Sequence, residues 1–419
     1  MLQQDVEIVV IGGGAAGLAA AIEARREGAR NVLILERGKE LGGILPQCIH
    51  TGFGLHYFGE NLTGPEYVSR FIKLANELRV EHKLETMVLK LSPDRKILVT
   101  NSVDGSLRLR AKAVVLAMGC RERPRGALGI PGTRPAGIFT AGTAQWLMDV
   151  GGHMLGKRIV ILGSGDVGLI MARRFAMEGA NVEAVIELMP YPGGLSRNVV
   201  QCLDDFDIPL LLSHTITHIH GSDRIEGVSI VRVDKHRKPI PETERIMECD
   251  TLIVSVGLIP ENELSRDAGL LLDENTGGPV VDENMETSLR GVFACGNVVH
   301  INDLVDHVTW SGEIAGNNAA RYALDNFPKP ARRIFLRTGR NVRYVVPQII
   351  SGVKPVTLYL RVKRPMRRVT INVGDHVPFF RRIVKPPEIE VLKLQCGEEI
   401  RNEELVVSVK RRDHREEDL

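Results

Sequence analysis

Two stretches of the chain share one pattern of hydrophobic and polar positions. Each has a strand that is apolar at nearly every position, a glycine-rich turn, a helix and a second apolar strand. The first stretch occupies residues 5–36 and the second residues 158–187. Continuously apolar strands are typical of a parallel sheet that helices cover on both faces. The pattern therefore predicts two β-α-β units.

The spacing within the two units is the same. The first glycine of the turn and the acid that ends the second strand are 24 residues apart in both, from Gly12 to Glu36 and from Gly163 to Glu187. Each turn reads G-x-G-x-x-G: the first glycine permits a tight turn, the second lets a pyrophosphate approach the backbone, and the third lets helix and strand pack closely. The terminal carboxylate can accept hydrogen bonds from ribose hydroxyls. We therefore predict two dinucleotide-binding sites, one on Gly12, Gly14 and Gly17 and one on Gly163, Gly165 and Gly168.

The rest of the chain extends the first unit and adds a different domain. Short apolar strands at 112–119, 249–257 and 291–299 match the two units, and a helix is predicted over about 308–323. After residue 327, β-forming residues lie between proline and glycine turns, which is typical of a β-rich domain. The predicted class is α/β, with two Rossmann-like domains, the second inserted in the first, and a β-rich C-terminal domain. The expected boundaries are 1–120 and 257–327 for the first domain, 121–256 for the second and 328–419 for the C-terminal domain.

The charge of the chain is balanced overall but not along its length. The 419 residues include 54 Lys and Arg and 52 Asp and Glu, 43% are hydrophobic and 5% aromatic, so the composition is that of a globular protein and gives no support to a nucleic-acid binder. From residue 328 onward, however, 21 cationic residues face 11 acidic ones, a net charge of +10, and the remainder is 33 against 41, or −8. The C-terminal domain is therefore basic, whereas the rest of the chain is acidic.

The cysteines and the N-terminus indicate a cytoplasmic protein. The six cysteines are scattered and form no C-x-x-C motif, which fits a reducing compartment better than a disulfide framework. The chain begins the first strand at once, without the pattern of a signal peptide. No apolar stretch reaches the roughly 18–20 residues that a membrane span needs, so no span is expected.

This arrangement of two units resembles the flavoproteins of the pyridine nucleotide–disulfide oxidoreductase superfamily over about residues 1–325. The resemblance includes the segments Leu41-Gly-Gly43, Ala117-Met-Gly119, Ser255-Val-Gly257 and Gly291–Asn297. It implies FAD in the first site and NAD(P)H in the second. The residues implied for FAD are Gly12, Gly14, Ala16, Gly17, Glu36, Arg37, Gly43, Ala117, Gly119, Gly296 and Asn297, and those for NAD are Gly163, Gly165, Asp166, Gly168, Glu187 and Gly257.

Two of these positions refine the expectation. Asn297 stands where the superfamily usually has Asp, so a contact with the ribityl chain would be made by an amide rather than by an ionised carboxylate. Glu187 would repel the 2′-phosphate of NADP(H), and the following Leu188-Met189 offers no arginine to bind one. We therefore expect NAD(H) to be the preferred nicotinamide nucleotide.

Within the superfamily, the sequence departs from the disulfide reductases. Only Cys48 follows the Gly42-Gly43 pair, where relatives of lipoamide dehydrogenase carry two cysteines, and the C-x-x-C of thioredoxin reductases is absent. Residues 42–58 and 118–125 resemble instead the FAD/NAD-binding subunits of heteromeric dehydrogenases for glycerol-3-phosphate, amino acids and opines, above all the flavoprotein that accompanies a glycerol-3-phosphate dehydrogenase or oxidase subunit. The resemblance implies electron transfer between NAD(H), FAD and a second flavoprotein subunit, which would act on the small-molecule substrate. The basic C-terminal domain is the expected docking element, with homodimerisation as the alternative.

Two other functions stay open at this stage. The chain is a relay subunit with a structural nucleotide, or a peroxide or disulfide reductase in which Cys48 is the single redox cysteine, although a buried packing role for this thiol is the simpler interpretation.

His50 and His56 lie in the expected flavin segment and are candidates for a substrate or electron-transfer role. His214, His218 and His220 are all at even positions and are expected on one face of a strand, but no cysteine or carboxylate completes a zinc set nearby, so no metal site is predicted.

Overall fold

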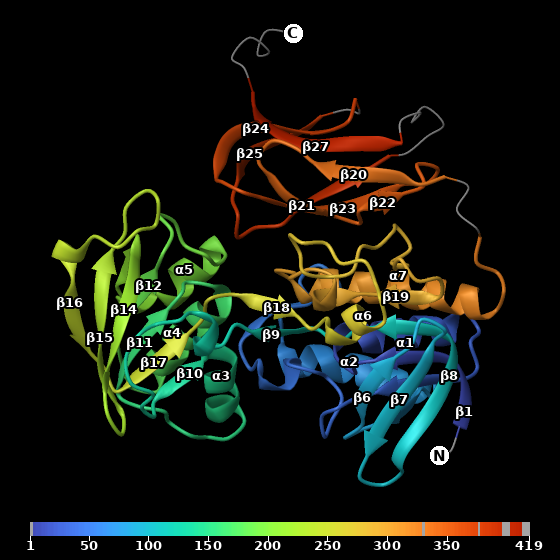
Figure 1. The fold of residues 1–419 in the computed structure, drawn as a ribbon, viewed down its shortest axis with the longest axis horizontal. Coiled ribbons are helices and arrows are strands. Elements are labelled where there is room, and N and C mark those ends of the chain that lie inside the picture. Colours follow the sequence, from blue (N-terminus) through green and yellow to red (C-terminus); the bar gives the residue numbers. More distant parts are fainter. Residues whose placement is uncertain (1–2, 329–331, 376–377, 396–402, 413–419) are drawn as a thin grey trace. The chain divides into compact units, whose positions relative to one another are not determined.

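The computed structural model describes residues 3–328, 332–375, 378–395 and 403–412. The chain divides into two compact units: unit 1 is Met1–Cys120 with Pro260–Leu419, and unit 2 is Arg121–Ile259 (Figure 1). The chain passes from unit 1 to unit 2 through β9 (Cys120–Glu122) and returns through β18 (Leu258–Pro260), and these two short strands pair with each other. Unit 2 is therefore an insertion in the sequence of unit 1.

Unit 1 is built on a seven-stranded sheet of order β5-β2-β1-β8-β7-β6, in which β19 also pairs with β8. Its strands are β1 (Gln3–Ile11), β2 (Val32–Leu35), β5 (Glu81–Lys83), β6 (Met87–Leu91), β7 (Lys96–Asn101), β8 (Gly105–Leu116) and β19 (Val292–Ala294). The long strand β8 changes partners along its length: its first half pairs antiparallel with β7, and its last residues, Val114–Leu116, pair parallel with β19. The parallel part carries the buried strands that the apolar pattern predicted.

The helices of unit 1 pack on this sheet through small side chains. They are α1 (Ala15–Arg26), α2 (Gly64–Glu77), α6 (Glu263–Asp267) and α7 (Val305–Ala323), and the short hairpin β3 (Thr51–Phe53) and β4 (Leu62–Thr63) precedes α2. Helix α7 lies against α1: a Cβ at Gly312 or Gly316 would overlap the backbone carbonyl oxygen of Ala16 or Ala20. The small residues of these two helices therefore allow their backbones to approach closely.

Unit 2 repeats this plan with a five-stranded parallel sheet of order β10-β17-β11-β12-β13. Its strands are β10 (Ile138–Thr140), β11 (Arg158–Leu162), β12 (Asn181–Glu187), β13 (Leu210–Leu212) and β17 (Thr251–Val254), and its helices are α3 (Ala141–Asp149), α4 (Asp166–Met177) and α5 (Ser196–Cys202). A three-stranded antiparallel sheet is formed by β14 (His214–Gly221), β15 (Ile225–Arg232) and β16 (Arg245–Glu248). Separate hydrophobic clusters cover the two faces of the parallel sheet.

The C-terminal part of unit 1 is a β-sandwich. One sheet has the order β22-β20-β27-β24-β25 and the other β21-β23-β26, and their inward side chains share one hydrophobic core. The strands are β20 (Ile334–Thr338), β21 (Val342–Val346), β22 (Ile349–Ile350), β23 (Val356–Val362), β24 (Met366–Val373), β25 (Phe379–Val384), β26 (Glu390–Leu394) and β27 (Glu404–Arg411). The fold confirms the predicted class, two Rossmann-like domains with the second inserted in the first and a β-rich C-terminal domain.

Two sequence expectations need correction. The predicted strand 291–299 ends at Ala294, because Gly296 has a φ of +71° and begins a 3-10 turn at Gly296–Val298. The three histidines of β14 do not share one face, because the register between β14 and β15 shifts between Ile216 and His218 and inserts an extra residue there. Such a bulge moves all later side chains to the opposite face. Among the described residues, no helix is long and apolar enough to cross a membrane.

Candidate functional site

The first glycine-rich turn joins β1 to α1 in the way that its spacing predicts. Gly12 has a φ of +106°, and a Cβ there would overlap the carbonyl oxygen of Ala117 at the end of β8. A Cβ at Gly17 would overlap the carbonyl oxygen of Gly12, so this glycine lets the helix pack on the turn. Gly14 differs, because its φ of −77° and ψ of −171° suit any residue and a Cβ there would meet only Gly43, with the Gly43 Cα at 3.7 Å. The fold therefore requires glycine at positions 12 and 17 but not at 14.

Glu36, just after β2, closes this turn. One of its carboxylate oxygens accepts the backbone N–H of Gly13 and the other that of Gly38, each at 2.7 Å. Because a carboxylate offers about four lone pairs, one on each oxygen stays available for a further donor. This is the acceptor pair that a ribose diol requires. Arg37, beside it, is exposed.

The Gly42-Gly43 loop lies against the N-terminus of α1. The N–H of Gly42 donates to the carbonyl oxygen of Gly13 at 2.8 Å, and Gly43, with a φ of +60°, faces Gly14. Helix α1 has no side-chain cap, so no side chain covers its first backbone N–H groups. Two facing glycines beside an uncapped helix N-terminus form a cradle for an anionic pyrophosphate. These residues fit the FAD that the sequence implies.

The second turn repeats this geometry in unit 2. Gly163 has a φ of +96°, and a Cβ there would overlap the carbonyl oxygen of Ser255, which follows β17 as Ala117 follows β8. A Cβ at Gly168 would meet the Gly163 carbonyl oxygen at 2.9 Å. Gly165 again has an unstrained φ of −66°, and a Cβ there would meet only Ser255, at 3.6 Å or more. Gly257 follows at the end of the same segment, as Gly119 does in unit 1.

Glu187 ends β12 and is buried, with 8% of its surface exposed. One carboxylate oxygen accepts the N–H of Ser164 at 3.0 Å and its hydroxyl at 2.5 Å, and the other accepts the N–H of Met189 at 2.8 Å. Ser164 and Met189 stand where Gly13 and Gly38 stand in unit 1. The Ser164 hydroxyl thus occupies the second lone pair of Glu187 Oε2, whereas the corresponding lone pair of Glu36 is available in the first site. Glu187 keeps one available lone pair, on Oε1. The carboxylate stays an acceptor beside the turn, as a nicotinamide dinucleotide requires.

The repeat extends beyond the glycine-rich turns, in a part that the sequence prediction missed. The three motif glycines and the acid of the first cradle recur 151 residues later, and the same offset takes Gly42 and Gly43 to Gly193 and Gly194. The N–H of Gly193 donates to the Ser164 hydroxyl at 2.7 Å, so this second pair also lies against its glycine-rich turn. The sequence carries this signal, but only a comparison of the two units over a longer stretch than the turn reveals it.

Asp166, a predicted NAD residue, has a role within the protein. Its Oδ1 accepts the N–H of Leu195 at 2.8 Å and the side-chain amide of Asn198 at 2.6 Å. The carboxylate therefore holds the start of α5, next to Gly194, at the N-terminus of α4. It supports the loop of the second cradle, and direct contact with a nucleotide stays a prediction.

Asn297 lies in the turn after β19. Its amide nitrogen donates to the Cys120 sulfur at 3.6 Å, and its oxygen accepts the N–H of Asn302 at 3.0 Å and the Asn302 side-chain amide at 3.2 Å. The neighbouring Gly296 packs on Ala16 of α1, where a Cβ would come within 2.8 Å of the Ala16 Cβ. The implied FAD segments 12–17, 117–120 and 296–297 therefore meet in one place.

Several buried polar atoms at the start of α7 lack a partner within the described structure. Asp306 Oδ1 accepts the N–H groups of His56 and Tyr57, at 3.1 and 2.7 Å, but Oδ2 has no hydrogen bond, nor has Nδ1 of His300 or of His307. Burial lowers the pKa of His300 to about 3 and also lowers that of His307, so both rings are neutral at pH 7. Because buried polar atoms are normally hydrogen-bonded, a bound polar group or an ordered water would complete these atoms. No glycine pattern marks them in the sequence.

Cys48 lies at the end of a short 3-10 turn, Leu45–Gln47, that follows the Gly-Gly pair. Its side chain is 8% exposed, and its sulfur donates to the carbonyl oxygen of Ile44 at 3.4 Å. His50 Nδ1 lies 3.0 Å from the carbonyl oxygen of Thr51 and its ring packs on Phe53. The structure therefore gives both side chains local packing contacts, and a redox role for Cys48 stays a prediction.

The remaining cysteines and histidines of unit 2 do not form a reactive cluster. Cys202 and Cys249 belong to hydrophobic clusters on opposite faces of the parallel sheet, and burial raises their thiol pKa values to about 11 and about 12. His214 Nδ1 lies 2.7 Å from the carbonyl oxygen of Leu212, and His220 Nε2 lies 2.9 Å from the Ser229 hydroxyl. No metal-binding group is found among the described residues. Cys396 lies outside them.

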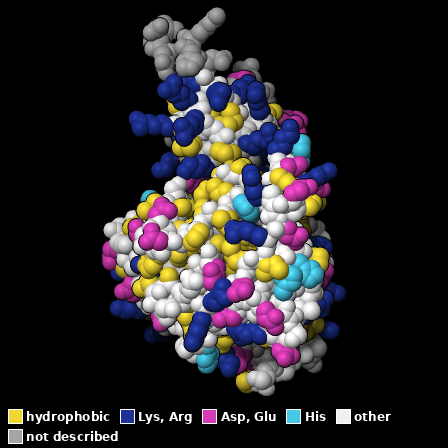
Figure 2. Space-filling model, turned by 90° about the vertical axis from the view of Figure 1, so that its left-hand side faces the viewer, with side chains coloured by type: hydrophobic (Ala, Val, Ile, Leu, Met, Phe, Trp, Pro, Cys, Tyr) yellow, Lys and Arg dark blue, Asp and Glu magenta, His cyan; other side chains and the backbone are white. Residues whose placement is uncertain are grey.

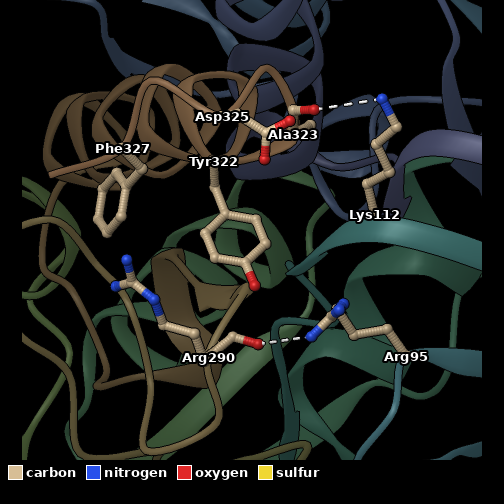
Figure 3. Close-up of a pocket in the computed structure, with 7 residues that line it drawn as sticks. All are labelled: Arg95, Lys112, Arg290, Tyr322, Ala323, Asp325 and Phe327. Carbon is tan, nitrogen blue, oxygen red and sulfur yellow. Dashed lines mark hydrogen bonds between the residues drawn. The ribbon is translucent and has the colours of Figure 1, made fainter. Parts of the chain in front are cut away.

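A surface pocket of about 320 Å³ in unit 1 is separate from these cradles (Figure 3). Its three cationic side chains each have a partner: Lys112 donates to the Ala323 carbonyl oxygen at 3.3 Å, Arg95 to that of Arg290 at 2.9 Å, and Arg290 pairs with Glu286 at 2.6 Å. The pocket is lined by Arg95, Lys112, Arg290, Tyr322, Ala323, Asp325 and Phe327, none of which is a predicted site residue. We therefore assign it no part in nucleotide binding.

Two matched cradles in one chain define an oxidoreductase that uses two dinucleotides. A sequence model of the pyridine nucleotide-disulphide oxidoreductases matches residues 6–319, more than half of the chain. The chain therefore belongs to this family and is an FAD- and NAD(P)-dependent oxidoreductase, as the sequence predicted.

Individual relatives differ in activity. One of them, a subunit of the opine oxidase of Agrobacterium tumefaciens, is 26% identical over 343 residues, which cover 77% of this chain and 66% of that protein. The chain thus spans slightly less than two thirds of the opine oxidase subunit. Thioredoxin reductase of Listeria monocytogenes is 26% identical over 325 residues, 75% of this chain and 93% of the relative.

Solved structures give the same architecture. Thioredoxin reductase of T. acidophilum has a TM-score of 0.63 and 26% identity, and the match covers 77% of this chain and 99% of that structure. A NAD-dependent persulfide reductase of A. fulgidus, at 20% identity and a TM-score of 0.59, shares the fold over 89% of this chain and 69% of its own.

Proposed function

We propose that this chain is the NAD-linked flavoprotein subunit of a heteromeric dehydrogenase for a small substrate such as glycerol-3-phosphate. The observation that carries the proposal is the matched pair of cradles, one in each unit, with an acid at the same place in both. Gly12, Gly14, Gly17, Glu36 and Gly43 would hold FAD. The corresponding residues of unit 2, Gly163, Gly165, Gly168, Glu187 and Gly194, would hold NAD(H). The two bound cofactors supply the hydride chemistry.

The role of the protein is then to bind the two cofactors and to orient them. The uncapped N-termini of α1 and α4 offer backbone N–H groups to two pyrophosphates, and Glu36 and Glu187 present acceptors to the ribose hydroxyls. At the buried start of α7, His300 and His307 are neutral and leave ring nitrogens without a partner. Electrons would leave for a partner subunit that oxidises the substrate, since the related opine oxidase protein is by its name one subunit of an oxidase.

NADH should reduce the flavin faster than NADPH, because Glu187 repels a 2′-phosphate. We expect Glu187→Gln to lower the NADH-to-NADPH ratio of flavin reduction rates by about tenfold, which corresponds to about 1.4 kcal/mol. The matched control is Glu36→Gln in the first cradle, which should leave this ratio unchanged per bound flavin. Stopped-flow absorbance at the flavin band measures both. Equal or faster reduction of the wild type by NADPH would contradict the assignment, and a flavin that neither nucleotide reduces would favour a relay subunit with a structural nucleotide.

A second candidate function is suggested by Cys48, which is buried beside the first cradle. In a single-cysteine peroxide or disulfide reductase this thiol would be the redox centre, and Cys202 and Cys249, on opposite faces of the sheet of unit 2, cannot form a redox pair with each other. We expect Cys48→Ser to change NADH-dependent flavin reduction by less than about twofold, since the hydroxyl can replace the hydrogen bond to Ile44 and no thiolate takes part in hydride transfer.

The same variant decides between the two functions. FAD content and the thermal unfolding midpoint are measured alongside the reduction rate. If Cys48→Ser folds and keeps its FAD but no longer accepts electrons from NADH, the thiol hypothesis replaces the one proposed here.

A further inference from the structure

The C-terminal β-sandwich carries a large excess of positive charge. Between residues 332 and 412, the described part of the chain contains 18 Lys and Arg and 5 Asp and Glu, a net charge of +13. Figure 2 shows these basic side chains gathered on the sandwich, at the top of the view. When every charged residue from 328 to the C-terminus is counted, 21 Lys and Arg against 11 Asp and Glu, the net charge is still +10. The acids of this domain therefore cannot neutralise it.

Part of this excess lies on the outer face of one sheet. Strand β24 pairs with β25 through Arg367 and Ile383, and with β27 through Val369 and Arg411. This register places Arg368 beside Arg382 on one neighbouring strand and beside Arg412 on the other, where the Arg412 N–H donates to the Arg368 carbonyl oxygen at 2.9 Å. Three exposed arginines thus lie in one row across three strands. Like charges opposite one another destabilise a sheet, so folding does not explain this row.

Another basic residue lies beside the row. We define the arginine face as Arg368 and Arg382 of the row together with Lys410, which pairs with Thr370 two residues further along β24 and lies on the same side of the sheet; all three are exposed. None of them forms an ion pair with a described residue, whereas other cations of the sandwich do: Arg381 pairs with Glu390 at 2.6 Å and Arg337 with Glu404 at 2.7 Å. The charges of the arginine face are therefore available for an ion pair with a group outside the described residues.

We infer that the arginine face binds an acidic surface of the partner subunit, an inference that rests on the function proposed above. A protein fits this face better than a nucleic acid or a membrane. Phe380, 53% exposed, is the aromatic residue beside the row, but Arg412 lies over its ring at 5.0 Å. A ring covered in this way is not presented for base stacking or for insertion into lipid. An exposed sheet surface with dispersed cations suits an acidic protein surface, which would speed association and make it sensitive to salt.

The test is a double charge reversal in the full-length protein. The tagged wild type is purified from its native source, and the flavoprotein subunit that co-purifies is identified by mass and purified separately as the probe. Arg368→Glu with Arg382→Glu should weaken binding of that subunit at least about tenfold at low salt, and the difference from wild type should shrink as ionic strength rises. The matched control is Arg108→Glu with Arg110→Glu, which makes the same change in net charge on exposed positions of β8 and should leave binding unchanged.

NADH-dependent reduction of ferricyanide separates the inference from the proposed function. This activity should be the same in all three proteins, because the arginine face lies outside both cradles. The proposed function fails if no flavoprotein subunit co-purifies with the wild type, and the inference then fails with it. If the subunit binds but the reversal leaves its affinity unchanged, or weakens it no more than the control does, the inference alone is wrong. It is also overturned if the reversal abolishes self-association, or binding of phosphatidylserine vesicles or duplex DNA, while affinity for the subunit is retained.

Discussion

Gly14→Val should give a folded protein that has lost FAD. The backbone angles of Gly14 suit any residue, and within the protein a Cβ would meet only Gly43, with the Gly43 Cα at 3.7 Å. The open space beside Gly14 is therefore required for binding the ligand and not for folding. We expect the affinity for FAD to fall about 100-fold or more, since a side chain at this position would stand between the backbone and the pyrophosphate. Flavin absorbance per protein and circular dichroism measure the two properties.

The equivalent substitution in unit 2 is the matched control. Gly165 has the same unstrained conformation and the same open space, so Gly165→Val should retain a full content of FAD while losing flavin reduction by NADH. Gly17→Ala differs from both, because its Cβ would overlap the Gly12 carbonyl oxygen, and it should lower stability as well as FAD binding. A yellow Gly14→Val protein with undiminished flavin would refute the assignment of the first cradle.

Arg361→Met should strongly destabilise unit 1, because it removes a buried charge that several groups hold in place. Arg361 lies in β23, its side chain is 12% exposed, and its guanidinium pairs with Asp303 at 2.5 Å. It also donates to the Tyr344 hydroxyl at 3.0 Å and to the Pro386 carbonyl oxygen at 2.8 Å. Burial acts to lower the pKa of Arg361, but Tyr344 and Asp303 raise it above its usual value, so the group stays charged.

Removing this cation leaves Asp303 in a buried place without its ion-pair partner. Breaking a buried pair in this way costs about 3–5 kcal/mol of the free energy of unfolding, whereas replacing both partners by apolar residues is often nearly neutral. Arg361→Met with Asp303→Leu should therefore recover part of the stability that Arg361→Met loses; the rest is lost because Asp303 also accepts the N–H of Ile389 at 2.6 Å. Chemical denaturation of the three proteins measures these differences, and a single variant as stable as the wild type would show that the pair contributes little.

The spacing of glycines and acids was sufficient to predict both cradles, because the β-α-β turn is a local structure. All the residues that shape it lie within about 40 positions of one another, apart from the strand end that closes it, which a glycine two residues later marks in the sequence. The same local reasoning gives the buried parallel strands. It also gives the basic character of the C-terminal domain, since charge can be counted without knowing the fold.

What could not be predicted depends on contacts between distant segments. Arg361 is 58 residues from Asp303, and no periodicity links them. The bulge after Ile216 is fixed by pairing with β15, so alternation alone placed three histidines wrongly on one face. The orphaned polar atoms become visible only in the folded chain. Asp306 there accepts the N–H of His56, and the rings of His300 and His307 pack on Tyr359.

The position of β19 has a consequence for synthesis of the chain on the ribosome. The edge of β8 at Val114–Leu116 receives its last parallel partner only when Val292–Ala294 has been made, after all of unit 2. At roughly 5–20 residues per second, this interval lasts about 10–35 s. During that time unit 2 can complete its own sheet, whose last strand ends at Val254, while unit 1 still has an open strand edge. The inserted unit is therefore expected to fold first, and the nascent N-terminal segment is the part of the chain that a chaperone would meet.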